Sequence, residues 1–415
     1  MTNTKNNQAP EKADVIISGG GIAGLTLAVL LGRIGAKIAL IDPSPLDSIT
    51  NPKQSGRTVA LMQTSLNILK SAGLSTFCES SGSPLEVMRI IDDSIPGGKV
   101  IEADFDSNDI NLPRFSMNLP NGPLRKAIFE EAKKIKTISL HMPRTLEDYE
   151  VNDHGVTATL DNGAQIEASL IVGADGRGSL VRKIAGIGCW KKEYDQSAIT
   201  CVINHSLSHN NTATEFHRPS GPLALVPLPG NRSSIVWVER RARAEEIIAL
   251  PKDAFEQKLQ DSTKEILGAI TLETGPECWP LCTIKARKMT APRVALIAEA
   301  AHVMSPITAQ GLNLSLRDVA SLAETIADAL RLGIDPGSRE PLRRYERRRS
   351  LDVTSRVLGV NRMNEMVSTD IPPLKTLRRT GLSFVDRILP VRNFAMQHGL
   401  APHLDQGRLM QGKKL

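Results

Sequence analysis

The chain has 415 residues, of which 23% are charged and 41% hydrophobic, with 25 prolines and 31 glycines. These proportions are ordinary for a folded protein, and they exclude a disordered, collagen-like or disulfide-scaffold chain. At roughly 150 residues per domain the length suggests two or three domains, enough to enclose a large cofactor. The net charge of +6 mildly favours anionic ligands or lipid headgroups and does not by itself argue for nucleic acid.

The sequence also indicates a compartment. Its five cysteines are odd in number and scattered, which favours a reducing environment over a disulfide framework. Residues 1–14 are polar and show no secretory signal, and no apolar run reaches the roughly 18 residues of a membrane helix. We expect a cytoplasmic protein, with peripheral contact at the inner face of a membrane as the alternative.

A strand, a glycine turn, a helix and a second strand open the chain. The first strand is Ala13 to Ser18, and it runs directly into the turn Gly19 to Gly24. The helix spans Leu25 to Ile34, and the second strand, Lys37 to Ile41, ends at Asp42. This order is typical of a βαβ dinucleotide-binding unit.

The residue types of that turn suit a pyrophosphate. Gly19 and Gly21 permit a tight turn and a close approach, and Gly24 lets the helix pack on the strand. The helix N-terminus, with Ile22 and Ala23, attracts negative charge, and Asp42 suits a ribose hydroxyl. The motif predicts a dinucleotide and does not choose between FAD and NAD.

The middle of the chain has the alternating pattern of β-strands. Val151 to Leu160 and Gln165 to Val172 suggest a hairpin around Asp161-Asn162-Gly163. Further alternating runs between Ala198 and Val238, separated by Asn, Pro and Gly turns, predict a mostly antiparallel sheet in a second domain.

After Arg293 the pattern returns to a buried strand, VALIA, and then to a helix from about Leu312 to Leu332 that Gly333 ends. Past Pro336 the chain is basic and helical in pattern to its end. We interpret the arginine run at 343–349 as a solvated helix face.

Three separated segments together resemble the FAD-dependent aromatic hydroxylases of the p-hydroxybenzoate hydroxylase type, over nearly the whole chain. The first is the glycine turn with Asp42. The second, GADGRGSLVR at Gly173 to Arg182, matches the family motif G-A-D-G-x-x-S-x-V-R. The third is Arg293 to Asp318, where the family shows R-x-x-L-x-G-D-A-A-H followed by P-x-x-G-Q-G-x-N. Read without the resemblance, Asp175-Gly176 is either a carboxylate beside a phosphate-bearing ligand or a simple turn.

The resemblance implies a role for each segment. The glycine turn would hold the AMP half of FAD, the acid of the third segment would contact the ribitol, and Pro306 would lie beside the isoalloxazine ring. Backbone amides after Gln310-Gly311 would face the flavin N1 and O2 edge, where a helix N-terminus stabilises negative charge. The expected FAD-binding residues are Gly19, Gly21, Ile22, Ala23, Gly24, Asp42, Arg57, Arg125, Asp175, Gly176, Glu299, Pro306, Gly311, Leu312 and Asn313, and the expected catalytic residues are Pro306, Gly311 and Arg57.

The chain departs from the family pattern in the third segment. Ala298-Glu299 stands where the family has Gly-Asp, and Thr308-Ala309 replaces a more glycine-rich pair. Because Glu keeps the charge on a longer arm, we expect FAD to be retained with its ribitol contact shifted. His302 in the same segment is either a structural hydrogen-bonding residue or a proton donor.

Within that superfamily the chain is similar to the ubiquinone-biosynthesis hydroxylases. The matches are Arg57 in SGRTVAL, the strand pair from Phe216 to Val238, and YERRR from Tyr345 to Arg349. They imply hydroxylation of a polyprenylated phenol through a flavin C4a-hydroperoxide, with O2 as co-substrate and NAD(P)H or another electron donor as reductant. A membrane surface or other ubiquinone-biosynthesis proteins are the expected partners, and nucleic acid is not.

We therefore expect an α/β fold in which a Rossmann-like FAD-binding domain is joined to a second, mostly antiparallel β-sheet substrate domain and a C-terminal helical region. The expected FAD-binding domain is discontinuous, at 1–75, 112–182 and 283–335. The substrate domain would take 76–111 and 183–282, and the helical region 336–415.

Other interpretations remain open. The enzyme alternatives are a hydroxylase of a soluble aromatic catabolite and an NAD-dependent dehydrogenase, and the alternative from another class is a non-catalytic FAD-binding subunit of a quinone-biosynthesis complex. His205 and His209 are four apart without further ligands nearby, so we expect no metal site. The basic amphipathic segment Leu374 to Val391 fits either a lipid surface, a partner protein or core packing.

Overall fold

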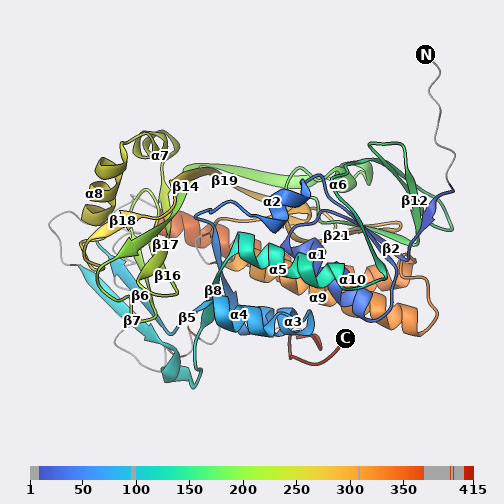
Figure 1. Ribbon diagram of the computed structural model, residues 1–415, viewed down its shortest axis with the longest axis horizontal. Helices are drawn as coiled ribbons and strands as arrows, with labels where there is room; N and C mark the ends of the chain where they lie inside the picture. The colour runs from blue at the N-terminus through green and yellow to red at the C-terminus, as the bar shows by residue number, and fades with distance from the viewer. Residues whose placement is uncertain (1–8, 95–99, 307–308, 369–392, 394–395, 397–405) are drawn as a thin grey trace, which may run out of the picture.

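The computed structural model describes residues 9–94, 100–306, 309–368, 393, 396 and 406–415. Sheets gather towards both ends of its long axis, and two long strands, β14 (Cys189–His205) and β19 (Glu277–Ala286), run along the molecule between them (Figure 1). The predicted α/β fold with a second, mostly antiparallel sheet is confirmed.

The strand before the glycine turn, β2, belongs to a six-stranded sheet with the order β20-β21-β13-β2-β3-β9. This sheet is parallel except at one edge strand, β20. Strands β2, β3 and β13 are buried along their whole length, as expected for a parallel sheet covered on both faces. The strands of this sheet are β2 (Val15–Ser18), β3 (Ile38–Ile41), β9 (Ile138–His141), β13 (Leu170–Gly173), β20 (Thr290–Ala291) and β21 (Val294–Leu296).

Three helices lie against one another beside this sheet: α1 (Ile22–Arg33) contacts both α5 (Asn121–Lys133) and α9 (Gln310–Arg331) (Figure 1). α10 (Arg339–Val367) in turn packs on α9. α1 is buried from Ala23 to Gly32 because its sequence is nearly all apolar. Both α1 and α9 begin a few residues before their predicted starts, inside the glycine motifs.

A four-stranded sheet, β1-β12-β11-β10, shares the same hydrophobic core. The predicted hairpin around residues 161–163 forms between β11 (Val156–Leu160) and β12 (Gln165–Ala168). The expected single strand from Val151 to Leu160 is instead broken, because the Asn152 side chain accepts hydrogen bonds from the amides of His154 and Gly155 and makes a second turn. The remaining strands are β1 (Glu11–Lys12) and β10 (Leu146–Val151).

The large sheet at the other end is antiparallel except where β6 runs parallel to β15, and its order is β22-β19-β14-β17-β16-β15-β6-β7 with β18 beside β14. A second apolar core, with Phe216, Trp237 and Phe255 fully or almost fully buried, lies under α7 and α8. Besides β14 and β19, its elements are β6 (Val87–Asp92), β7 (Ile101–Asp106), β15 (Thr212–His217), β16 (Leu223–Leu228), β17 (Arg232–Glu239), β18 (Ile270–Leu272), β22 (His302–Val303), α7 (Arg241–Ile248) and α8 (Lys252–Ser262).

A small sheet, β4-β8-β5, bridges the two regions, because β5 and β8 contact β16 while α9 packs near β4. Its strands are β4 (Thr58–Met62), β5 (Ser83–Leu85) and β8 (Ser116–Pro120). The other helices and turns of helix are α2 (Leu46–Thr50), η1 (Ser107–Ile110), α3 (Gln63–Ser71), α4 (Ser75–Ser81), α6 (Leu180–Ile184) and η2 (Ala298–Ala300).

The C-terminal end differs from the helical pattern read from the sequence. Residues 406–415 form turns, and Leu409 and Met410 are buried in the first core. The Leu409 amide donates to Glu324 of α9 at 2.9 Å, which ties this segment to the helix. The basic segment Leu374 to Val391 lies outside the described residues. Within the described part of the chain, none of the helices combines the length and apolar composition that a membrane crossing requires.

The packing of α1 on the glycine turn predicts a sharp cost for one added methyl group. A Cβ at Gly24 would lie 1.9 Å from the Gly19 carbonyl oxygen, so Gly24→Ala must push the helix from the sheet. We expect thermal or urea unfolding to show a loss of about 3 kcal/mol. Gly275→Ala is the matched control, because a Cβ there meets nothing within 4 Å, and an equal loss in both variants would contradict this packing.

Candidate functional site

The predicted motifs meet at one edge of the parallel sheet. The glycine turn follows β2, Asp42 follows β3, Asp175 follows β13, and Glu299 lies just after β21. Since these four neighbouring strands are parallel, their carboxyl ends lie side by side. At the usual spacing of about 4.8 Å between strands, the four positions cover roughly 15 Å along that edge, which suits an extended dinucleotide.

The glycine turn leaves the N-terminus of α1 open. Gly19 has φ +112°, and a Cβ there would meet the Ala174 carbonyl oxygen at 2.2 Å, so only glycine fits. Gly21, the N-cap of α1, makes no side-chain cap, and a Cβ on it would meet nothing within 4 Å. The first amides of the helix, at Ile22 and Ala23, therefore face open space with the positive end of the helix dipole.

Asp42 and Arg125 close one side of this turn. The Asp42 carboxylate accepts hydrogen bonds from the Gly20 amide at 2.6 Å and the Ser44 amide at 2.8 Å. Arg125 of α5 donates to the same carboxylate at 3.1 Å and to the Gly20 carbonyl at 2.7 Å. The two predicted residues thus lie together, and both also have a structural task in holding the turn.

The loop after β13 offers an acceptor without a partner. One oxygen of Asp175 accepts from the amides of Leu180 and Val181 at 2.8 and 3.1 Å, while the other, Oδ1, is buried and has no hydrogen-bond partner. Gly176 has φ +80° with nothing within 4 Å of an added Cβ. The buried oxygen and the open loop fit a ligand hydroxyl better than a turn alone, because an orphaned buried acceptor is costly.

Arg182 ties this loop to the third segment. It is 6% exposed and donates to the carbonyl of Ala300 at 2.7 Å and to that of Arg177 at 2.9 Å. These contacts let Arg182 orient the loop.

The departure at Ala298-Glu299 has a visible structural consequence. Ala298 has φ +55°, a left-handed conformation that costs a residue with a Cβ about 1–2 kcal/mol. Glu299 points out of this turn with 44% of its side chain exposed and pairs with Arg177 at 3.3 Å. The longer glutamate arm therefore reaches across to the neighbouring motif loop, at the surface where the ribitol contact is expected.

The N-terminus of α9 is likewise uncapped. Its N-cap, Ala309, has φ +49° and makes no side-chain cap, and a Cβ on Gly311 would meet nothing within 4 Å. The amides of Gly311 and Leu312 are thus placed for an anionic ligand edge. Pro306 lies just before this turn, and its carbonyl accepts from the Ala309 amide.

The Asn313 side chain, by contrast, is fully used within the protein. It is 0% exposed, and its oxygen accepts from the Met62 amide at 2.9 Å and the Ser65 hydroxyl at 2.7 Å. Its nitrogen donates to the carbonyls of Ala60 and Ala309, both at 2.8 Å. Asn313 therefore joins β4 to the start of α9, and only its backbone amide can serve a cofactor.

Arg57 directly precedes β4 and is exposed. Its guanidinium lies 5.0 Å from the ring centroid of Trp279, whose indole donates to Thr200 at 3.3 Å. Trp279 cannot be identified from the sequence, because a lone tryptophan in an alternating strand carries no signal of its own. The contact places Arg57 where the small sheet meets the large antiparallel one.

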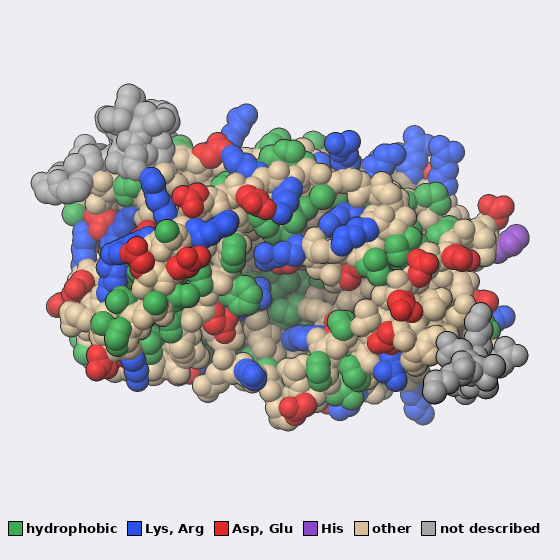
Figure 2. Space-filling model, turned by 90° about the horizontal axis from the view of Figure 1, so that it is seen from above, with side chains coloured by type: hydrophobic (Ala, Val, Ile, Leu, Met, Phe, Trp, Pro, Cys, Tyr) green, Lys and Arg blue, Asp and Glu red, His purple; other side chains and the backbone are tan. Residues whose placement is uncertain are grey.

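Figure 2 shows the surface hollowed near the middle of the molecule, with apolar side chains in its depth and several Lys and Arg side chains at its rim. Between the small sheet and the large one, the hydroxyls of Thr58 and Ser234 lie 2.7 Å apart, and Asn118 donates to the Pro227 carbonyl at 2.9 Å. These bonds join the small sheet to the large one.

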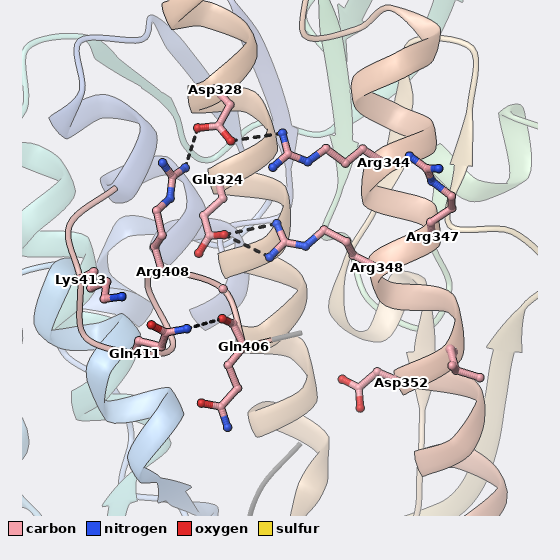
Figure 3. A pocket seen from close by; sticks show the side chains of 12 residues that line it. Glu324, Asp328, Arg344, Arg347, Arg348, Asp352, Gln406, Arg408, Gln411 and Lys413 are labelled. Atoms are coloured by element: carbon pink, nitrogen blue, oxygen red, sulfur yellow. Dashed lines mark hydrogen bonds and ion pairs between the residues drawn. The ribbon is translucent and has the colours of Figure 1, made fainter. Parts of the chain in front are cut away.

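A separate surface pocket of about 720 Å³ lies between α9, α10 and residues 406–413. Figure 3 shows that its charged side chains pair across it: Arg344 and Arg408 share Asp328, and Arg348 binds Glu324. These ion pairs hold the C-terminal segment against the two helices. None of the predicted site residues lines this pocket.

The residues along this edge have the chemistry that FAD requires. The orphaned Asp175 oxygen, the open space at Gly21 and Gly311, and two uncapped helix N-termini supply the acceptor and the donors that a flavin dinucleotide needs. We regard the residues present as fitting the group.

Comparison with known proteins gives the same family. A family model described as "FAD binding domain" matches residues 12–358. Ubiquinone hydroxylase UbiL of Rhodospirillum rubrum is 34% identical and covers 100% of this chain and 96% of its own length. The 3-demethoxyubiquinol 3-hydroxylase of Escherichia coli is 26% identical over 94% of this chain and 99% of its own length.

Among solved structures, p-nitrophenol 4-monooxygenase PnpA of Pseudomonas putida has a TM-score of 0.78 at 18% identity and covers 95% of this chain and 100% of its own. PqsL of P. aeruginosa, in complex with 2-aminobenzoylacetate, has a TM-score of 0.76 at 22% identity, covering 88% of this chain and 99% of its own. At these identities the structures show a shared fold.

The position of Glu299 predicts a loss of FAD affinity when its carboxylate is removed. If Glu299 contacts the ribitol, as the resemblance implies, Glu299→Ala would remove a charge-assisted hydrogen bond, so we expect FAD affinity, measured by fluorescence titration of the apoprotein, to fall about tenfold. Arg177→Ala is the control, because it breaks the same exposed ion pair and leaves the carboxylate. Unchanged flavin content in Glu299→Ala would remove Glu299 from the site.

Proposed function

This chain belongs to the family of FAD binding domains that its residues 12–358 match, and we propose that it hydroxylates the aromatic ring of a polyprenylated phenol in ubiquinone biosynthesis. FAD as cofactor, predicted from the three motifs, is confirmed by this family. The observation that carries the substrate class is the match over the whole chain to a ubiquinone hydroxylase.

When bound, FAD supplies the redox chemistry, taking electrons from a reductant and passing them to O2. The chain itself has to bind and orient the cofactor. We assign the AMP and pyrophosphate half to the Gly19–Gly24 turn with Asp42 and Arg125, and the ribitol to Asp175 and Glu299. The family ordinarily takes its electrons from NAD(P)H, and the single glycine-turn unit implies that such a donor binds only transiently.

The start of α9 then has the role of stabilising charge. The open amides of Gly311 and Leu312 lie at the positive end of a 22-residue helix, and they would stabilise negative charge at the N1 and O2 edge of a bound flavin. Pro306 and Arg57 would complete the wall of the ring site. Hydrogen bonds that close the two sheets against each other, such as Thr58 to Ser234, help to keep water out.

A polyprenylated substrate has to enter from a membrane, and the outward face of α10 is suited to contact one. Its outward face carries Leu351, Leu358, Met363 and Met366, which are 61%, 52%, 43% and 42% exposed. Arg347 and Arg362 are exposed on the same helix. Apolar side chains flanked by arginines suit an anionic membrane surface, so we propose peripheral contact through this face.

Deleting the gene tests both pathway and step. We expect mass spectrometry of a lipid extract to show less ubiquinone and an accumulated prenylated phenol that lacks one hydroxyl group. Wild type should restore ubiquinone and Gly21→Asp should not, because an aspartate fits that open N-cap but places a carboxylate where the pyrophosphate binds. Normal ubiquinone in the deletion strain would contradict the assignment and favour a soluble aromatic substrate.

The α10 surface predicts a loss of membrane binding in a double variant. Leu351→Gln with Leu358→Gln should reduce co-sedimentation with vesicles of anionic phospholipid about tenfold, because these two exposed leucines would contribute most of the apolar area that enters the lipid. Leu332→Gln is the control, since Leu332 is 73% exposed but lies outside α10. Equal sedimentation of all three proteins would exclude this face as the contact.

A further inference from the structure

A buried cluster of charges joins the third segment, which ends at Asp318, to α10. Asp318 of α9 is 0% exposed, and Arg349 of α10 is 3% exposed. Arg349 Nε donates to Asp318 Oδ1 at 2.8 Å, and His302 Nε2 lies 2.6 Å from Asp318 Oδ2. Arg349 also donates to Asp352 at 2.7 Å, and Asp352 in turn pairs with the fully buried Arg317 at 3.3 Å.

The same Asp318 oxygen holds the turn that carries Glu299. The Ala298 amide donates to Asp318 Oδ2 at 3.0 Å, and Ala298 is the residue in the left-handed conformation. A strained conformation of this kind persists only where the surroundings determine it. Asp318 supplies that constraint from outside the turn, and its own position depends on Arg349.

Asp318 remains ionised in this place. Burial alone would raise the pKa of its carboxyl group, but His302 and Arg349 together hold the pKa below its ordinary value. A carboxylate buried to this extent is not solvated by water, so its charge must be stabilised by hydrogen-bond and ion-pair partners. Loss of Arg349 would therefore release Asp318 from its present geometry.

We propose that Arg349 and Asp318 are positioning residues for the cofactor: α10 holds Asp318, Asp318 holds the Ala298 turn, and the turn aims Glu299 at the flavin ribitol. This inference rests on the proposed role of Glu299. It assigns Arg349, in the arginine-rich first half of α10, an indirect role in FAD binding, although no residue of α10 belongs to the predicted FAD contacts.

The test compares two adjacent arginines of α10. Arg349→Met removes the guanidinium that holds Asp318. Arg348→Met, the matched control, removes the guanidinium that pairs with Glu324, a carboxylate that is 3% exposed and lies away from the turn. For each protein the dissociation constants of FAD and of ADP are measured, because ADP occupies only the Gly19 half of the site.

We expect Arg349→Met to weaken FAD about tenfold and to change the ADP constant by less than about twofold. In Arg348→Met both constants should stay within about twofold of wild type, whatever its loss in thermal stability. If Arg349→Met does not fold, Arg349→Lys decides the question, because lysine keeps the charge but cannot reach Asp318 and Asp352 together. FAD affinity that is unchanged, or that falls in parallel with ADP affinity, would overturn the proposal.

A double variant separates positioning from general damage. Glycine adopts the left-handed conformation without strain, so Ala298→Gly should keep the turn in place when Asp318 is loose. We expect Ala298→Gly to recover at least about threefold of the FAD affinity that Arg349→Met loses. No recovery would contradict the link through Ala298. A protein that binds FAD normally but does not hydroxylate would refute the proposed function and leave this inference standing.

Discussion

The parallel alignment of β21, β13, β2 and β3 is the constraint on which the rest of the site depends. Residues from four separate parts of the chain, up to about 280 positions apart, meet because parallel strands present their carboxyl ends at one edge. A glycine turn, an unpartnered carboxylate oxygen and an exposed glutamate follow one another along that edge. The helix N-termini add hydrogen-bond donors to these acceptors, since α1 and α9 both begin without a side-chain cap and keep their first amides available.

The sequence was sufficient to predict the parts of the site that depend on contacts within one short motif. Gly19 and Gly24 are forced by close backbone approaches, and such positions have a recognisable spacing. The strand from Val151 to Leu160 was predicted incorrectly as one piece, because the turn at Asn152 depends on two hydrogen bonds that an alternating pattern does not reveal. The roles of Arg349 and Trp279 were also missed, since each is defined by a partner far along the chain.

The arginine run of α10 illustrates that second limit. Arginines on a helix ordinarily face water, and Arg347 does so at 64% exposure. Arg349, two positions later, points into the protein because Asp318 and Asp352 are both there to receive it. Only the tertiary structure distinguishes the two residues. Among the described residues, Ala298 and Ala309 are alanines in the left-handed conformation, which the sequence pattern likewise does not reveal.

We propose that this edge holds FAD and that the protein inserts one atom of O2 into a phenol ring. This proposal is tested most directly by supplying the purified FAD-bound protein with a reductant, a short-chain prenylated phenol and ¹⁸O2, and measuring the product by mass spectrometry. The account predicts a hydroxylated product that carries one ¹⁸O atom. A product oxygen derived from water, or oxidation of the reductant without any hydroxylated product, would contradict it.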